Sequence, residues 1–231
     1  MNLPPGFINQ SRIGNMQMGQ MCVNSQIPMI NPIGINNPRQ NINTMGINNQ
    51  MPMNNPMQMN YQIQMNNQNE GTNRLKREYD LCYNDNELIQ IGCNFGLENN
   101  NIYTWRITMV GPRNTPYEGG LFTIYAFFPS DYPNHGPEFK FKNKIYHLNV
   151  DNSPKDFGHI CINSINEWRI AGKVKNLPFY TMKQALFDIF CLFYNQGVDS
   201  AYDKEMENLY RTNKEKFNEE ARKWTELYAK A

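Results

Sequence analysis

The chain has 231 residues, of which 19% are charged, and its formal net charge is only +1. This balance gives no reason to expect nucleic acid or a membrane surface as the main partner. No stretch reaches the roughly 18 consecutive apolar residues that a membrane span needs, and the opening MNLPPGFINQ lacks the basic region and apolar run of a secretory signal.

The composition changes sharply near residue 70. Residues 1–71 consist mainly of Asn, Met, Gln, Pro and Ile, with no lysine and two aromatic side chains. Such a segment cannot bury enough apolar surface to offset the entropy of ordering it, so we predict a disordered tail over residues 1–71. Residues 72–231 contain 20 basic and 20 acidic residues, and this length suits one domain with a sizeable core.

The five cysteines are widely spaced, odd in number and form no Cys-x-x-Cys pair. The disulfide frameworks of secreted proteins usually contain an even number of cysteines. We therefore expect free thiols in a reducing compartment, which means an intracellular protein in the cytoplasm, the nucleus or both.

The predicted domain begins with a short amphipathic helix, RLKREYDLCY at residues 74–83, which turn residues close at 84–86. Four strand-like runs follow, at residues 89–95, 102–110, 121–128 and 139–141. The links between them are short and contain turn residues, such as NNN at 99–101 and GPRN at 111–114. Sequential strands with short links favour an antiparallel meander.

After the strands the pattern becomes irregular and then helical. Residues 146–180 show no sustained period, and loops of this length in a compact domain are usually functional or disordered. Two apolar stripes at helical spacing follow. The first contains Met182, Ala185, Leu186, Ile189, Phe190 and Phe193, and the second contains Phe217, Ala221, Trp224 and Tyr228. The order of elements predicts an α+β fold with helices packed on one face of a small sheet.

The long loop includes IYHLNVDNSPKDFGHICI at residues 145–162, which holds two of the three histidines and one cysteine. Structural zinc needs four ligands in close pairs, but no fourth ligand accompanies His147, His159 and Cys161. A Cys/His hydrolase usually takes its base from a distant segment, but His159 is two residues from Cys161. We therefore expect no metal site, and Cys161 is either a small buried side chain or has another chemical role.

Five motifs, in order along residues 74–230, resemble those of the ubiquitin-conjugating enzymes. They are PYEGG at 116–120 for P-Y-x-G-G, FPSDYP at 128–133 with Pro137 for F-P-x-x-Y-P-x-x-x-P, IYHLN at 145–149 for Y-H-P-N, GHICI at 158–162 with Trp168 for G-x-I-C-L and a later tryptophan, and the ending YRTNKEKFNEEARKWTELYA. The resemblance implies the family's fold, in which a four-stranded antiparallel meander has an N-terminal helix before it and C-terminal helices after it.

The resemblance also implies an activity. Such an enzyme accepts ubiquitin or a ubiquitin-like protein from an activating enzyme as a thioester, here on Cys161, and transfers it to a lysine amine of a substrate protein, usually with a ubiquitin ligase. A thiolate attacks well and gives a reactive acyl carrier. Exchange between thioesters is nearly isoenergetic, so no strong base is required beside the sulfur. No cofactor is implied, because the activating enzyme consumes the ATP.

Three polar residues of the loop take roles from the resemblance. The amide of Asn149 stabilises the oxyanion that lysine attack creates, or braces the loop that does so, and losing such a donor typically costs about 10²–10³ in rate. A turn-stabilising asparagine is the alternative. His147 matches the motif histidine that braces the loop, so we assign it structure. For His159 we expect a solvated loop position, the alternative being a ring close enough to activate the thiol.

Opposite the cysteine, the family places a small acid or serine that helps the incoming lysine lose its proton. Counting back from the last helices puts Ser200 there, with Asp199 beside it. The position equally allows Ser200 to be the N-cap of the following helix. Trp168 matches the tryptophan that follows the family's cysteine, and we assign it a supporting role.

Three surfaces resemble the family's partner-binding surfaces. Lys76 and Arg77 fall on the helix whose basic face meets the activating enzyme, although an ordinary solvated face is an equal alternative. Asn94 falls where many members bind a second ubiquitin non-covalently, and an exposed polar strand end is the alternative. Asn134 stands where many members place an aromatic or basic residue that docks ligases.

Two departures from the family pattern bear on activity. Leu148 replaces the proline of His-Pro-Asn, so a ring that fixes φ is missing. Cys161 follows Asn149 by twelve positions, where the family commonly has eight, so DNSPKDF contains a small insertion. Both changes could misplace Asn149. They therefore favour, mildly, a rival reading in which the fold is a catalytically inactive module that binds ubiquitin or another partner. The presence of Cys161 argues against this rival.

Overall fold

The computed structural model describes residues 71–175 and 180–230. The predicted disordered tail, residues 1–71, lies outside the described residues except for Gly71, which is helical and buried, so the prediction is wrong for this residue. The elements are, in chain order, a helix over residues 71–83, α3 (Asn86–Gln90), β1 (Asn94–Glu98), β2 (Asn101–Val110), β3 (Leu121–Phe127), β4 (Glu138–Phe141), α4 (Asn163–Ala171), α5 (Met182–Leu192), η1 (Val198–Ser200), α6 (Lys204–Thr212) and α7 (Lys214–Tyr228). The predicted α+β fold with a four-stranded antiparallel meander is confirmed.

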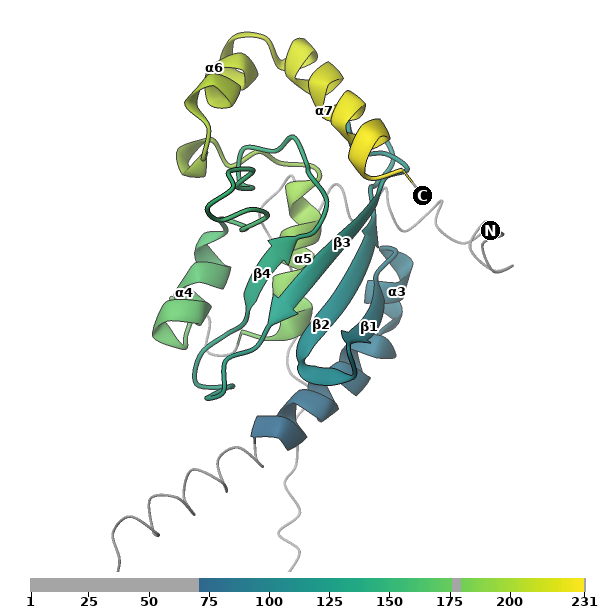
Figure 1. Ribbon diagram of the computed structural model, residues 1–231, viewed down its shortest axis with the longest axis vertical. Coiled ribbons are helices and arrows are strands. Elements are labelled where there is room, and N and C mark those ends of the chain that lie inside the picture. Colours follow the sequence, from purple (N-terminus) through teal and green to yellow (C-terminus); the bar gives the residue numbers. More distant parts are fainter. Residues whose placement is uncertain (1–70, 176–179, 231) are drawn as a thin grey trace, which may run out of the picture.

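The sheet has the order β1-β2-β3-β4, and Figure 1 shows the strands side by side in this order. The β1–β2 hairpin turns at Asn99 and Asn100, which have positive φ angles of 51° and 56°, a conformation that asparagine tolerates better than most residues. Alternate residues of β2, such as Trp105 and Ile107, are fully buried. One face of the sheet therefore forms a wall of the core.

The core lies between this face and α5. In Figure 1, α5 crosses behind β3 and β4, and α6 and α7 lie beyond one end of the sheet. The ring of Phe193, just after α5, lies 5.1 Å from that of Phe122 in β3 and 6.4 Å from that of Phe141 in β4. The last helix is tied to the sheet through its end, where Leu121 N donates to Ala229 O at 2.6 Å. The C-terminal helices therefore belong to the same packed unit as the sheet.

The predicted strand over residues 89–95 is wrong for most of its length. Asp85 accepts hydrogen bonds from the backbone N–H groups of Glu87 and Leu88 and begins the short helix α3, so the strand starts only at Asn94. The apolar residues that suggested a strand belong to one helical turn. A five-residue helix is too short to show a period, and its cap is the signal that identifies it.

The expectation of an irregular segment over residues 146–180 is also partly wrong, because α4 occupies Asn163–Ala171. This helix buries two side chains, Ile165 and Trp168, which are too few to show a stripe in the sequence. It ends at Gly172, whose φ of 68° is the left-handed conformation typical of a helix C-terminus. Residues 145–162 before it contain no regular helix or strand and form two isolated bridges, one of them to β4.

One bridge and the hydrogen bond from Phe141 N to Gly158 O, at 2.8 Å, hold residues 158–159 against β4, and the other bridge lies within the 145–162 segment. His159 pairs with Lys140, and Ile160 pairs with Val150. Gly158 has a φ of 80°, and a Cβ atom there would lie 2.0 Å from the carbonyl oxygen of Phe141. Only glycine permits this close approach, and it sets the position of the chain three residues before Cys161.

No described helix is long and apolar enough to cross a membrane. The thiols of Cys82, Cys93 and Cys161 are free, as expected. Cys191 is disulfide-bonded, so the expectation of free thiols is wrong for this residue.

The cap of α3 leads to a stability prediction. Asp85 also forms an ion pair with Lys183, at 2.7 Å between Oδ2 and Nζ, and both side chains are partly exposed. Asp85→Asn keeps a capping oxygen and loses the ion pair, so its cost should stay below about 1 kcal/mol. Asp85→Ala loses both, and its cost should be about 1–2 kcal/mol. Urea unfolding of the two variants measures the difference, and equal costs would contradict the capping role.

Candidate active site

Cys161 lies in the chain between the bridge at Ile160 and the start of α4. Its backbone N–H donates to the carbonyl oxygen of Asn149 at 2.8 Å, and the residue is half-buried. Cys82 and Cys93 are 4% and 3% exposed. Burial raises the pKa of the Cys82 thiol to about 12 and that of Cys93 further still. Among the free thiols of the described chain, Cys161 is therefore the one accessible to a reagent or substrate.

His147 is 1% exposed and uses both ring nitrogens. Nδ1 accepts from the backbone N–H of Asn149 at 3.0 Å, so the ring proton is on Nε2, which donates to the carbonyl oxygen of Leu192 at 2.9 Å. Burial lowers the pKa of His147 to about 4. The ring is neutral at physiological pH, and with both nitrogens hydrogen-bonded it has no lone pair for a metal ion or a thiol proton.

The side chain of Asn149 is buried and binds the loop that contains η1. Oδ1 accepts from the N–H of Gly197 at 2.7 Å, and Nδ2 donates to the carbonyl oxygens of Gly197 at 2.8 Å and Ser200 at 3.3 Å. A Cβ atom on Gly197 would lie 2.8 Å from Nδ2, so this contact requires glycine. In this arrangement the amide of Asn149 fixes the 197–200 loop.

Leu148 makes a contact that proline cannot make. Its backbone N–H donates to Oε1 of Gln196 at 2.9 Å. Nε2 of Gln196 donates in turn to the hydroxyl of Tyr117 at 2.9 Å, and this hydroxyl donates to the carbonyl oxygen of Tyr146 at 2.8 Å. The chain of bonds joins the histidine motif to the loop before η1. Gln196 was not identified from the sequence, because its partner is 48 residues away.

The insertion before Cys161 is closed at its base. The N–H of Asp151 donates to the carbonyl oxygen of His159 at 2.9 Å, and the N–H of Gly158 donates to the carbonyl oxygen of Asp151 at 2.6 Å. Residues 152–157 therefore form an excursion outside this pairing. The hydrogen bond between Cys161 N and Asn149 O is kept, so the insertion does not separate these two residues.

Ser200 and Asp199 lie in η1 (Val198–Ser200). The side chain of Asp199 is exposed and Ser200 is half-buried. The alternative that Ser200 caps the following helix is wrong. α6 begins at Lys204, and its cap is Asp203, which accepts from the N–H groups of Glu205 and Met206.

The expected solvated position of His159 is wrong, because the residue is 8% exposed. Its Nδ1 lies 3.4 Å from Oε1 of Glu138 and 3.9 Å from Oδ2 of Asp156. These three side chains are close enough to hold a metal ion. However, the ammonium of Lys140 lies 2.6 Å from Oδ1 of Asp156 and 3.4 Å from Oε1 of Glu138. Lys140 therefore already supplies the positive charge of this cluster.

Trp168 supports the fold around α4. It is 4% exposed, and its ring packs edge-on against Tyr132 and Tyr180 at centroid distances of 6.1 and 5.2 Å. Its carbonyl oxygen accepts from the N–H of Gly136 at 3.0 Å. The tryptophan thereby joins α4 to the proline-rich loop that contains Asn134, whose side chain is exposed.

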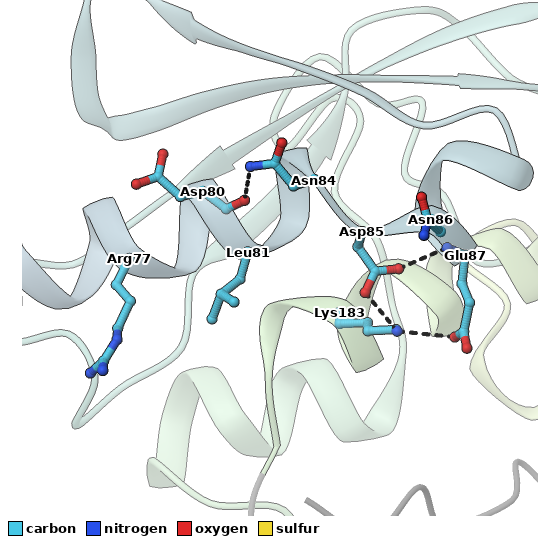
Figure 2. A pocket seen from close by; sticks show the side chains of 8 residues that line it. All are labelled: Arg77, Asp80, Leu81, Asn84, Asp85, Asn86, Glu87 and Lys183. Carbon is cyan, nitrogen blue, oxygen red and sulfur yellow. Dashed lines mark hydrogen bonds and ion pairs between the residues drawn. The ribbon is translucent and has the colours of Figure 1, made fainter. Parts of the chain in front are cut away.

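The residues predicted to bind partners are exposed and lie apart from Cys161 in the chain. Lys76 and Arg77 are on the 71–83 helix, and Asn94 begins β1. Arg77 lines an open groove of about 600 Å³, which Figure 2 shows between this helix, α3 and the start of α5. At its far end, Lys183 is paired with Asp85 and Glu87. None of the groove-lining residues belongs to the segments around Cys161.

Two residues beside the Cys161 sulfur were not identified from the sequence. Nδ2 of Asn166, in the first turns of α4, lies 3.7 Å from Sγ. The hydroxyl of Tyr202, just after η1, lies close enough to Cys161 for the sulfur to raise the pKa of this hydroxyl. Asn166 follows the cysteine by five residues, and its role depends on the helix that starts between them.

Comparison with known proteins identifies related chains. The ubiquitin-conjugating enzyme family matches over residues 74–225. The chain is 33% identical over 160 residues to the probable ubiquitin-conjugating enzyme E2 31 of Arabidopsis thaliana, covering 69% of this chain and 94% of that protein. A crystal structure from Plasmodium yoelii assigned to the ubiquitin-conjugating enzymes has a TM-score of 0.59 at 31% identity, covering 70% of this chain and 96% of that one. The E2 domain of a Toxoplasma gondii ubiquitin-conjugating enzyme gives 0.55 at 31% identity, covering 68% and 97%.

The buried His147 leads to a prediction about pH. The unfolded chain takes up a proton on this residue below about pH 6.5, whereas the folded chain does so only near pH 4. The free energy of unfolding should therefore fall across this window as the pH is lowered, by about 3 kcal/mol in full. Urea unfolding at pH 7 and pH 4.5 should show this loss in wild type and not in His147→Gln. His135→Gln, at an exposed histidine, should keep it. An equal loss in wild type and His147→Gln would contradict the prediction.

Proposed function

Because the chain belongs to the ubiquitin-conjugating enzyme family, we propose that it carries ubiquitin or a ubiquitin-like protein as a thioester on Cys161 and transfers it to a lysine amine of a substrate protein. An activating enzyme supplies the modifier and consumes the ATP, and a ubiquitin ligase assists the transfer. The chain itself needs no cofactor. Its place of action is the cytoplasm, the nucleus or both.

The observation that carries this proposal is the setting of Cys161. It is a free, half-buried thiol, whereas Cys82 and Cys93 are buried. Its backbone is bound to that of Asn149, whose side chain in turn fixes the 197–200 loop. A carrier nucleophile needs access and a stable frame, and it needs no strong base, because one thioester is exchanged for another.

Under this proposal, the 197–200 loop receives the incoming lysine. Asp199 is the exposed carboxylate of that loop, and Ser200 is beside it. Together they help the ammonium of the substrate to lose its proton. Asn149 acts mainly as the brace of this loop, because both atoms of its amide are hydrogen-bonded to the backbone of Gly197.

The rival reading of an inactive binding module depended on two departures from the family pattern. The peptide N–H that Leu148 introduces is satisfied by Gln196, and the insertion is closed below Cys161 by its own backbone pairing. Neither departure disturbs the contact between Asn149 and Cys161. No observation in the described residues favours the rival over the enzyme.

Partner surfaces follow from the same proposal. The exposed Lys76 and Arg77 of the 71–83 helix meet the activating enzyme. Asn94, at the exposed start of β1, lies on the surface for a second, non-covalent ubiquitin. Asn134, in the exposed loop that Trp168 supports, lies on the ligase surface.

The test is a loading reaction with the full chain, an activating enzyme, ATP and ubiquitin, analysed on a non-reducing gel. We expect an adduct that reductant removes from wild type. Cys161→Ser should give either no adduct or a reductant-resistant ester, because an oxygen replaces the sulfur. Cys82→Ala, at a buried free thiol, is the matched control and should load like wild type. A wild-type chain that forms no adduct with ubiquitin or any related modifier would contradict the proposal.

A further inference from the structure

Two side chains outside the histidine–leucine–asparagine motif place hydrogen-bond donors at the Cys161 sulfur. Nδ2 of Asn166 lies 3.7 Å from Sγ, which is within the range of an N–H···S contact. The backbone of Asn166 is fixed by α4, because its N–H donates to the carbonyl oxygen of Ile162 at 2.9 Å. The second group is the hydroxyl of Tyr202, which lies close enough to Cys161 for the sulfur to raise the pKa of this hydroxyl. The two donors reach the sulfur from different elements, one from α4 and one from the segment after η1.

The amide that the family resemblance would aim at the reaction is already occupied. Oδ1 and Nδ2 of Asn149 are both hydrogen-bonded to the backbone of Gly197, and Nδ2 also to Ser200. Turning this amide toward Cys161 would break all three bonds and release the loop. A donor for the sulfur therefore has to come from elsewhere.

The amide of Asn166 has no such competing role. Its Oδ1 is buried and accepts no hydrogen bond, so within the described residues the Cys161 sulfur is the hydrogen-bond partner of this side chain. An amide can present either its oxygen or its nitrogen to a neighbour, but a thiolate can only accept hydrogen bonds. The reactive form of Cys161 therefore selects the N–H of Asn166.

Tyr202 is held in place by two further contacts. Its backbone N–H donates to the carbonyl oxygen of Leu148 at 3.0 Å, and its ring packs edge-on against His159 at a centroid distance of 6.3 Å. Burial raises the pKa of Tyr202, and the nearby Cys161, Asp151 and Asp156 raise it further. The hydroxyl therefore keeps its proton at physiological pH and remains a donor.

We infer that Asn166 and Tyr202 are catalytic residues that stabilise negative charge on the Cys161 sulfur. The inference rests on the proposed thioester function. In loading, the Sγ thiolate forms a bond to the modifier's carbonyl carbon, and the bond from that carbon to the activating enzyme's sulfur breaks. In transfer, the lysine, already deprotonated to the neutral amine, forms a bond from nitrogen to the same carbon, the C–Sγ bond breaks with its electron pair left on Sγ, and the second proton of the nitrogen passes to water. The two donors stabilise Sγ at the start of the first step and at the end of the second.

The first test needs no modifier or partner enzyme. Alkylation of Cys161 by iodoacetamide at pH 7 is followed by peptide mass spectrometry in the full chain. Asn166→Asp keeps the size of the side chain but replaces its donor by a carboxylate, and Tyr202→Phe removes only the hydroxyl. Each should slow alkylation by about three- to tenfold. Losing one hydrogen bond to a charged group lowers the amount of thiolate by more than this. The thiolate that remains is a stronger nucleophile, which offsets part of the decrease. The double variant should be slower still.

Asn163→Asp is the matched control. It makes the same chemical change on the same helix, two residues from Cys161, at an exposed side chain, so it reports the effect of added charge alone. It should alkylate within about twofold of wild type, a difference close to RT in free energy and well below one hydrogen bond. Asn166→Ala supplies a second removal of the donor without added charge and should also be slow.

The second test uses the loaded protein. Discharge of a preformed thioester to saturating free lysine should fall by about tenfold in Asn166→Ala and in Tyr202→Phe. If these variants alkylate and discharge like wild type, the inference is wrong while the carrier function stands. If wild type forms no thioester, the proposed function fails, and the transfer part of the inference fails with it. Slow alkylation in the variants would then still support the donors at the sulfur.

Discussion

The pairing of the Asn149 side chain with the backbone of the 197–200 loop is the interaction on which the site depends. It joins the segment before Cys161 to the segment opposite, and both are irregular chain that no strand or helix would otherwise hold in register. Asn149 is itself fixed from two sides, by the ring of His147 on its N–H and by the N–H of Cys161 on its carbonyl oxygen. The frame is therefore made of hydrogen bonds between buried or partly buried groups, and breaking one costs free energy where it leaves a buried polar atom unsatisfied.

The departures from the family motif show how this frame tolerates change. Replacing a proline by Leu148 adds a peptide N–H in a fully buried position, and such a group is destabilising unless it finds an acceptor. Gln196 supplies the acceptor and at the same time joins the loop to Tyr117 in the hairpin after β2. A hydrogen bond to Gln196 thus takes the place of the rigid proline ring. The backbone of the motif is positioned by a residue outside the motif and not by a restricted φ angle of its own.

Much of the fold could be predicted from the sequence, because long elements show their period. The structure shows both the alternate burial of side chains such as Trp105 and Ile107 in β2 and the buried apolar stripe of α5. The helices α3 and α4 bury too few side chains to show a pattern, and the capping residue Asp85 is the signal that could have indicated α3. In the site, spacing and resemblance were enough to select His147, Asn149 and Cys161. Gln196 and Tyr202 could not be selected in this way, because tertiary contacts bring them to the site across more than forty residues of chain.

The closed base of the excursion over residues 152–157 has an evolutionary consequence. Two backbone hydrogen bonds between Asp151 and the 158–159 segment isolate the excursion from the distance between Asn149 and Cys161. Residues can therefore be gained or lost at its tip while the contact between Asn149 and Cys161 stays unchanged, so the length of the chain can vary here beside the candidate site. A lineage can alter the surface beside Cys161 at this point without changing the hydrogen bonds that position Asn149 and Cys161.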